Sequence, residues 1–215
     1  PEMSRGLGDV YKRQVFVLAC INSENTRQII YELDPRTFDI VGTYKFRDAS
    51  VLAHMNTLTY NPDTNLLYTT NAMVDGHRIT TIDADTMSIG NTITIPERVF
   101  NLAYDKKTNQ FMSIVPIDAT MRRINYYTSQ FQLVQSKDID ANYDDYNNNG
   151  AFANDGKTIF ATLSTVITVD KTGNVTKIAS FPKNLEIEDM DMRHNIMYAA
   201  VNMNHKVFIY TMLNY

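Results

Sequence analysis

The chain has 215 residues but only one cysteine, and it has no tryptophan. A single cysteine excludes a disulfide framework and a zinc site built from several cysteines. Cys20 lies in the apolar run VFVLACI, where a buried thiol is expected rather than a nucleophile. Apolar runs are short as well, since none approaches the ~20 residues that a helix needs to span a bilayer. We therefore predict no membrane span in this sequence.

The chain also lacks clusters of positive charge. Its formal net charge at pH 7 is −4, and no long run of lysine or arginine occurs. Proteins that bind nucleic acid present a clustered positive field to the phosphates. The charge pattern therefore argues against a nucleic-acid partner.

The first residues are unlike the rest of the chain. Residues 4–14 (SRGLGDVYKRQ) resemble the in-frame translation of a sequencing adapter, which marks the chain as a metagenomic fragment. A segment of this kind is left out of fold reasoning. We treat residues 1–14 as non-native and expect the natural chain to begin upstream of Val15, with any signal peptide in the missing part.

What the sequence does contain is a hairpin that recurs about every 44 residues. The clearest copies are Asn56–Thr70 (NTLTYNPDTNLLYTT) and Phe100–Ile114 (FNLAYDKKTNQFMSI), and weaker ones are Asn149–Leu163 and Glu186–Ala200. Self-similarity at a fixed period of this size is typical of repeat proteins. Because each unit is made of strands, we predict an all-β fold, a β-propeller of four-stranded antiparallel blades.

The unit from Ala53 to Pro96 shows the strand order best. Its turn NPDTN joins the first two strands, because proline fixes φ and the Asn and Asp side chains bond the local backbone. The four expected strands are Thr57–Tyr60, Leu66–Asn71, Arg78–Asp83 and Ile89–Ile95.

Third strands of several units end in an aspartate, at Asp34, Asp83 and Asp170. An aspartate at such a position accepts hydrogen bonds from backbone N–H groups two residues on and so ends the strand. We predict a structural role for these three carboxylates rather than a catalytic one.

Counting the units gives five. They are Val15–Arg47, which begins at its second strand, then Ala53–Pro96, Val99–Ile139, Asn148–Pro182, and Leu185–Tyr215 with three strands only. An open arc of blades exposes unpaired strand edges. We therefore expect residues 15–215 to form one partial propeller domain, and the natural protein to have six or seven blades closed by a strand from the missing N-terminal part.

The segment Leu58–Asn71 (LTYNPDTNLLYTTN), followed by Ile79–Thr86 (ITTIDADT), resembles the YVTN-type propeller repeat, which is related to the NHL and lactonase-like propellers. Tyr68–Asn71 stands where that repeat has its YVTN strand, and Thr81–Asp83 stands where it has the strand ending VIDT. The lack of tryptophan separates the chain from WD-type blades. The resemblance implies a propeller and a secreted or surface protein, but no particular activity.

In propellers of this kind, ligands bind at the mouth of the axial channel, on residues at and before the first strand of each blade. Loops on a rigid scaffold commonly carry binding residues. The repeat register places mostly polar side chains there, with Phe100 the one apolar member. We predict a ligand site made of His54, Asn56, Arg98, Asn147, Asn149, Asn184 and Glu186. His54 titrates near neutral pH, but no serine or cysteine stands beside it in a pattern that supports a nucleophilic triad.

The polar segment from residue 138 to 149 allows two further interpretations. Oxygen ligands at alternate positions, as in a calcium loop, are offered by Asp138, Asp140, Asn142 and Asp144, although the glycine and glutamate of an EF-hand are absent. Tyr143 and Tyr146, set among Asp and Asn, instead suit contact with a sugar or a peptide. We expect no cofactor other than this possible Ca²⁺.

The sequence favours a non-enzymatic binding module, exported or on the bacterial cell surface and monomeric, that recognises a glycan, a peptide or a partner protein at the channel mouth. One alternative is a metal-dependent hydrolase of lactonase type, in which Asn56, Asn149, Glu186 and Glu188 hold the metal. The other is a structural repeat domain within a larger surface protein. No sequence feature identifies the ligand.

Overall fold

The computed structural model describes residues 7–8, 15–20, 28–46, 52, 54–71, 76–140, 151–154, 158–161, 164–170, 172–182, 185–193, 196–203 and 206–213. All regular structure in this part of the chain is β-strand, arranged in small antiparallel sheets. No helix in these ranges is long and apolar enough to cross a membrane. The chain divides into two compact units, Pro1–Phe100 and Asn101–Tyr215.

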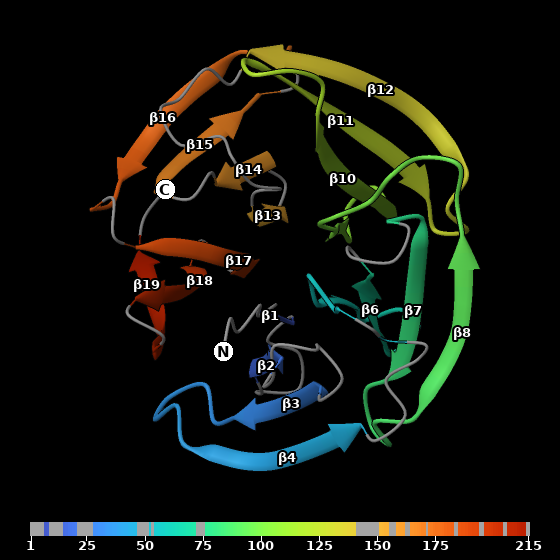
Figure 1. The fold of residues 1–215 in the computed structure, drawn as a ribbon, viewed down its shortest axis with the longest axis vertical. Coiled ribbons are helices and arrows are strands. Elements are labelled where there is room, and N and C mark those ends of the chain that lie inside the picture. The colour runs from blue at the N-terminus through green and yellow to red at the C-terminus, as the bar shows by residue number, and fades with distance from the viewer. Residues whose placement is uncertain are drawn as a thin grey trace. The chain divides into compact units, whose positions relative to one another are not determined.

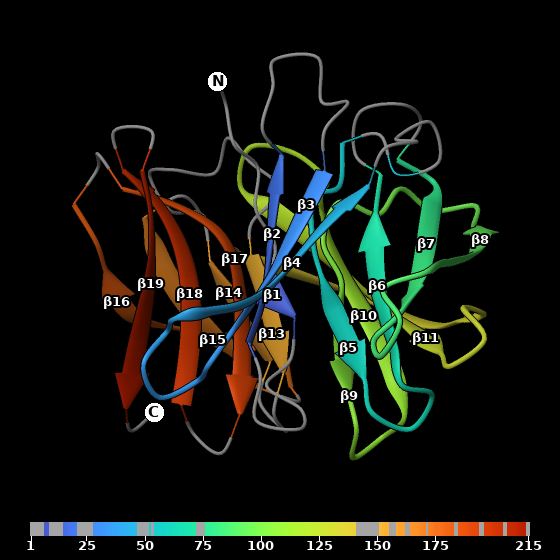
Figure 2. The same ribbon diagram turned by 90° about the horizontal axis from the view of Figure 1, so that it is seen from below.

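The first unit contains two four-stranded sheets, each with its strands in chain order (Figures 1 and 2). One sheet is made of β1 (Leu7–Gly8), β2 (Val15–Cys20), β3 (Gln28–Leu33) and β4 (Ile40–Phe46). The other is made of β5 (Thr59–Asn61), β6 (Leu66–Thr70), β7 (Arg78–Asp83) and β8 (Ile89–Thr94).

The second unit contains two four-stranded sheets and one three-stranded sheet (Figure 1). The first of these is made of β9 (Ala103–Asp105), β10 (Gln110–Pro116), β11 (Met121–Thr128) and β12 (Leu133–Asp140). The next is made of β13 (Ala151–Asn154), β14 (Thr158–Ala161), β15 (Thr165–Val169) and β16 (Val175–Ser180). The last is made of β17 (Glu186–Arg193), β18 (Ile196–Met203) and β19 (Lys206–Leu213).

The repeat pattern predicts this topology well. The expected third strand Arg78–Asp83 is β7 to the residue, and the four strands of its unit pair in the order β5-β6-β7-β8. The last unit has three strands among its described residues, as expected. The first strand is shorter than predicted, because β5 begins at Thr59. Before it, only Met55 forms an isolated bridge, with Asn71.

The prediction that the first sheet lacks its first strand is wrong. Leu7 and Gly8 form β1, which pairs with Val17 and Phe16 of β2. These two residues belong to the segment that resembles an adapter. Strand pairing uses backbone N–H and C=O groups, which every residue except proline carries in full. A segment of any origin can therefore complete the sheet.

Apolar cores lie between consecutive sheets within each unit. In the first unit, Leu18 and Ile30 of one sheet pack with Leu58, Leu67 and Ile82 of the next. In the second unit, one cluster joins β9–β12 to β13–β16, and another joins β13–β16 to β17–β19. The inner strand β13 lies beside both β9 and β17. Within each unit, consecutive sheets thus bury apolar faces against each other.

Candidate binding site

The strands of each four-stranded sheet pair in chain order, so the connections between them lie at two ends. We call the turn end the one that carries the connections from the first strand to the second and from the third to the fourth. The loop end carries the connection between the second and third strands and the connection to the next sheet. Because strands in an antiparallel sheet alternate in direction, these connections fall at opposite ends.

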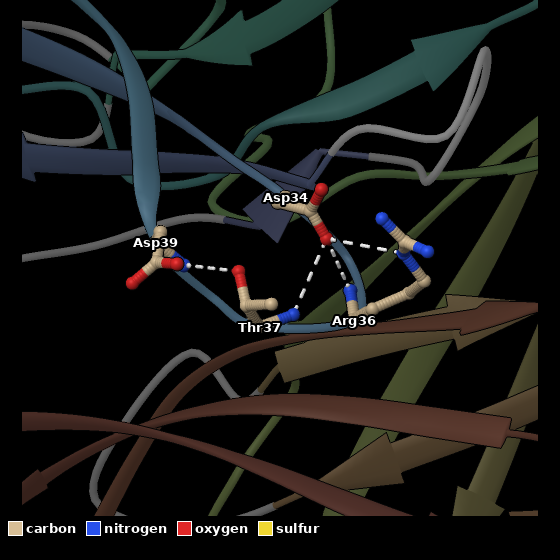
Figure 3. Close-up of polar contacts among 4 residues, drawn as sticks. All are labelled: Asp34, Arg36, Thr37 and Asp39. Carbon is tan, nitrogen blue, oxygen red and sulfur yellow. Dashed lines mark hydrogen bonds and ion pairs between the residues drawn. The ribbon is translucent and has the colours of Figure 1, made fainter.

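The turn end is closed by local hydrogen bonds, and the predicted role of the aspartates in it is confirmed. In Figure 3, one carboxylate oxygen of Asp34 accepts hydrogen bonds from the backbone N–H groups of Arg36 (2.8 Å) and Thr37 (3.2 Å). Asp83 accepts equivalent bonds from Asp85 (3.1 Å) and Thr86 (2.8 Å). These carboxylates end the third strand and satisfy the turn backbone.

Asp170 makes the same type of turn in the second unit. It accepts bonds from the backbone N–H and hydroxyl of Thr172 (2.7 and 2.6 Å) and from the backbone and side chain of Asn174 (2.9 Å each). The hydroxyl of Thr172 and the amide of Asn174 lower the pKa of Asp170 well below its ordinary value. In the sheet β9–β12, Thr128 takes the place of the aspartate and accepts from the backbone N–H of Gln130 (3.2 Å).

The first turn of each clear repeat is fixed by a tyrosine. Tyr60 donates its hydroxyl hydrogen to Asn65 Oδ1, and Tyr104 donates to Asn109 Oδ1, at 2.9 Å in both cases. Both asparagines have positive φ, 57° and 54°, a conformation that asparagine tolerates better than most residues. The same lock therefore recurs 44 residues apart.

The loop end of the sheet β5–β8 is organised around the backbone of Phe100. Its carbonyl oxygen accepts a hydrogen bond from the side-chain amide of Asn56 (2.7 Å) and another from the hydroxyl of Thr70 (2.9 Å). The N–H of Val99 also donates to Gly76 O (2.6 Å). The connection that leaves β8 is thus tied back to the segment before β5, to the end of β6 and to the connection between β6 and β7.

Arg98 lies on this anchored connection. Its guanidinium carbon is 4.6 Å from the centroid of the Phe100 ring, which is the geometry of a cation–π contact. Arg98 is exposed, and no carboxylate of the described residues forms an ion pair with it. The ring of Phe100 thus holds the guanidinium of Arg98 in place, and the guanidinium stays accessible to an anion.

Gly76 allows this close approach. Its φ is +64°, and a Cβ atom added there would lie 3.3 Å from Arg98 Nε and 3.6 Å from Phe100 Cε1. A side chain at position 76 would therefore be strained in its own backbone and would crowd the arginine.

The structure brings together two of the predicted site residues, Asn56 and Arg98, through Phe100. His54 is half-buried and directly precedes the bridge between Met55 and Asn71 at the same loop end. Sequence reasoning treated Phe100 as the apolar exception and missed Thr70 and Gly76. The key group of Phe100 is its carbonyl, which residue type does not reveal, although the repeat register does point to position 100.

The remaining predicted ligand-binding residues belong to the second unit. Glu186 begins β17, is half-buried and lies opposite Asn202 of β18. Its neighbour Glu188 accepts a hydrogen bond from the Asn202 amide at 3.3 Å. The other predicted residues, Tyr143, Tyr146, Asn147, Asn149 and Asn184, lie outside the described residues.

The predicted calcium ligands are only partly described. Asp138 lies in β12, where both its carboxylate oxygens accept bonds from Arg123, at 2.6 and 2.9 Å. This pairing with Arg123 lowers the pKa of Asp138. Asp140 ends the same strand, while Asn142 and Asp144 lie outside the described residues. In the part of the chain that is described, no three His, Cys, Asp or Glu side chains gather as a metal site would require.

Comparison with known proteins bears on the fold alone. No known protein family matches the chain, and no curated protein sequence matches it. One similar structure is a chain of the nidogen/laminin complex, at 8% identity and a TM-score of 0.59, over 98% of this chain and 80% of that one.

Another is the hydrazine synthase of Kuenenia stuttgartiensis, at 14% identity and a TM-score of 0.49. The match covers 90% of this chain but only 60% of the length of that protein. In all, 688 solved chains show significant similarity, so the fold by itself selects no function.

Proposed function

We propose that the chain is a non-enzymatic β-propeller binding module, which recognises an acidic group of a glycan, peptide or partner protein at the loop end of the sheet β5–β8. The observation that carries this proposal is the exposed guanidinium of Arg98, held over the ring of Phe100. Arginine binds carboxylate, sulfate and phosphate groups with a planar fork of donors, which suits recognition better than a flexible ammonium does.

The propeller part of the proposal rests on the repeated sheets. A four-stranded antiparallel unit recurs with apolar cores between consecutive sheets, and inner strands of neighbouring sheets lie side by side in the second unit. Radial repetition of such sheets is the propeller architecture. The similarity to a chain of the nidogen/laminin complex, which is propeller-like, supports the same conclusion.

The binding part rests on order at the loop end. A side chain that is already fixed loses less conformational entropy when a ligand binds. Asn56 and Thr70 hold the Phe100 carbonyl, and the Phe100 ring holds Arg98. An exported or cell-surface location, proposed from the repeat resemblance, would present this surface to glycans and proteins outside the cell.

The test is a screen of the full chain against an array of neutral and acidic glycans and against peptides with and without Asp and Glu. We expect the bound ligands to carry an anionic group. Arg98→Ala should weaken binding at least about tenfold, which corresponds to the ~1.4 kcal/mol of one charge-assisted contact. Arg98→Lys should recover only part of it, because lysine lacks the planar fork.

Arg36→Ala is the matched control, because Arg36 is also exposed but lies at a turn end beside Asp34 (3.7 Å). It should leave binding unchanged. Equal loss from Arg36→Ala and Arg98→Ala would indicate a general charge effect and would contradict the site. Catalytic turnover of a bound ligand would contradict the non-enzymatic assignment.

A further inference from the structure

Charged side chains of the first unit are divided between the two ends of its sheets. In the described part of this unit, the carboxylates at the turn ends are those of Asp34, Asp39, Asp63, Asp83 and Asp85. The loop ends carry Lys45 near the end of β4, Arg78 at the start of β7 and Arg98 beyond β8. Figure 2 shows β4 and β6 running toward the same side of the unit. The loop ends of both sheets therefore place positive charge on one side.

Gly76 determines which edge of the Arg98 guanidinium is open. A Cβ atom at position 76 would lie 3.3 Å from Nε and 3.7 Å from Nη2, and both nitrogens are nearer to it than the guanidinium carbon is. Position 76 therefore faces the edge that carries these two nitrogens. Because glycine has no side chain, position 76 leaves this edge uncovered, and acceptor oxygens can approach to the ~2.7–2.9 Å of a charge-assisted hydrogen bond.

Another arginine of the chain shows what this edge binds. Nε and Nη2 of Arg123 donate to the two carboxylate oxygens of Asp138, at 2.6 and 2.9 Å. A planar carboxylate lies in the plane of the guanidinium in such a pair, whereas a sulfate or a phosphate directs further oxygens out of that plane. Beside Arg98, one of those oxygens would point toward the Phe100 ring, which is 4.6 Å from the guanidinium carbon. The face of an aromatic ring is negative, so the edge favours a carboxylate.

We propose that the loop end of the sheet β5–β8 binds an acidic segment of a polypeptide, with one Asp or Glu carboxylate held side-on by Nε and Nη2 of Arg98. Gly76 keeps this edge open, and the ring of Phe100 disfavours sulfate and phosphate. The inference rests on the proposed function, because it names the ligand class of that same site.

A polypeptide suits the surroundings of Arg98 better than an acidic glycan does. Sites for small ligands are lined mainly by apolar and aromatic side chains. The exposed large apolar side chains described in the first unit all lie at turn ends, and they are Phe38, Ile40, Val41 and Ile89. The ring of Phe100 is buried, since the residue is only 9% exposed. The loop ends instead carry Lys45 and Arg78, whose charge attracts a chain with several carboxylates toward Arg98.

The probe is a capped, labelled peptide of alternating glycine and glutamate, titrated into the full chain and followed by fluorescence anisotropy. We expect the peptide to bind, and Arg98→Ala to weaken binding at least about tenfold. A peptide of glycine and phosphoserine carries more negative charge but should bind about tenfold more weakly. An oligogalacturonate, which has its carboxylates on sugar rings, should also bind more weakly, and a peptide of glycine and glutamine should not bind.

These outcomes separate the inference from the proposed function. If the phosphoserine peptide or the oligogalacturonate binds at least as tightly as the glutamate peptide, and Arg98→Ala abolishes that binding, the anion site stands and the inferred ligand class is wrong. If binding of no anionic probe depends on Arg98, the inference and the proposed function are both wrong.

The role of Gly76 is tested by Gly76→Ala, which should weaken binding of the glutamate peptide at least about tenfold because the methyl group covers the open edge. Gly173→Ala is the matched control, since Gly173 also has a positive φ, +94°, but lies at a turn end of the second unit. It should leave binding unchanged. Equal losses from both variants would indicate backbone strain and would contradict the role of Gly76.

Phe100→Leu keeps the test decisive if Gly76→Ala fails to fold. The variant keeps the Phe100 carbonyl position and removes the aromatic ring. It should bring the affinities of the glutamate and phosphoserine peptides to within about threefold of each other. An unchanged ratio of the two affinities would show that the ring does not select for carboxylate.

Discussion

The two ends of the sheets β5–β8 and β9–β12 follow different rules. At the turn end, the same contacts recur 44 residues apart, as in the bonds of Tyr60 to Asn65 and Tyr104 to Asn109. At the loop end, the two equivalent positions differ. The side chain of Asn56 donates a hydrogen bond to a backbone carbonyl, whereas the ring of Phe100 makes a cation–π contact with Arg98. Repeated contacts hold the fold together, and the end that varies is where a site can be built.

The difference is also one of chemistry. The carboxylates at the turn ends accept hydrogen bonds from neighbouring backbone N–H groups, so they are less able to bind a ligand. At the loop end, polar side chains donate hydrogen bonds to the carbonyl of Phe100, and the guanidinium of Arg98 stays exposed. Substitutions at the turn end should therefore change the free energy of unfolding, whereas substitutions at the loop end should change ligand binding.

The largest loss of stability is expected from Phe111→Ala. Phe111 is 0% exposed, stacks on Phe131 at 4.5 Å and contacts Tyr104 at 5.0 Å, all at the turn end of its sheet. Removing a buried aromatic ring costs about 3–5 kcal/mol through lost burial and the cavity left behind. Urea unfolding measures the change. A loss under about 1 kcal/mol would mean that this end is not tightly packed.

The next effect is expected from Asp83→Ala. The substitution removes two backbone hydrogen bonds and one from the Thr86 hydroxyl at 2.9 Å. We expect the free energy of unfolding to fall by about 1–2 kcal/mol, with no change in ligand binding. Asp83→Asn is the matched control, since its amide oxygen can still accept from the turn and should recover most of the loss. Equal losses from both would point to charge rather than turn geometry.

A smaller effect is expected from removing one hydroxyl. Tyr104→Phe loses the bond to Asn109 Oδ1 and keeps the ring, so unfolding should become easier by about 1 kcal/mol. Tyr60→Phe should match it, because the bond to Asn65 has the same length. The prediction fails if the two repeats respond by clearly different amounts, since the recurring lock would then not be equivalent.

Acid should weaken the turn ends through their aspartates. Backbone N–H groups lower the pKa of Asp34 below 3.8, and Thr172 and Asn174 lower that of Asp170 further. A group whose folded pKa is lowered stabilises the protein above its unfolded pKa, and this contribution is lost as pH falls through the folded pKa. Thermal unfolding midpoints should therefore drop as pH falls below about 4.

Asp170→Asn isolates one such group. The variant should be less stable than the parent at pH 7, and the difference should shrink in strong acid, where the parent carboxylate is protonated. A constant difference from pH 7 to about pH 2 would show that the lowered pKa of Asp170 contributes nothing to stability.

The turn end could be predicted from the sequence because its contacts are local. Asp34, Asp83 and Asp170 act on residues two to four positions away, and β7 ends where the aspartate pattern placed it. Alternating apolar residues fix the strands. The start of β5 could not be predicted as well. The side-chain pattern of a strand begins at Thr57, but the backbone pairs only from Thr59 onward.

The loop end could be predicted only in outline. The register located positions 56 and 98, but the contacts there join residues 30 and 44 apart through a main-chain carbonyl. A backbone acceptor has no sequence signature. The pairing of Leu7–Gly8 with β2 was missed for a related reason, since any backbone can fill an open edge.

The most direct test of the separation between the two ends is to measure thermal unfolding and array binding together for Arg98→Ala and Asp83→Ala. The account predicts that Arg98→Ala loses acidic ligands about tenfold with the stability changed by under about 0.5 kcal/mol. Asp83→Ala should show the reverse, with lower stability and unchanged binding. If Arg98→Ala destabilises the chain as much as Asp83→Ala does, or leaves binding intact, the loop end is part of the scaffold and the proposed site is wrong.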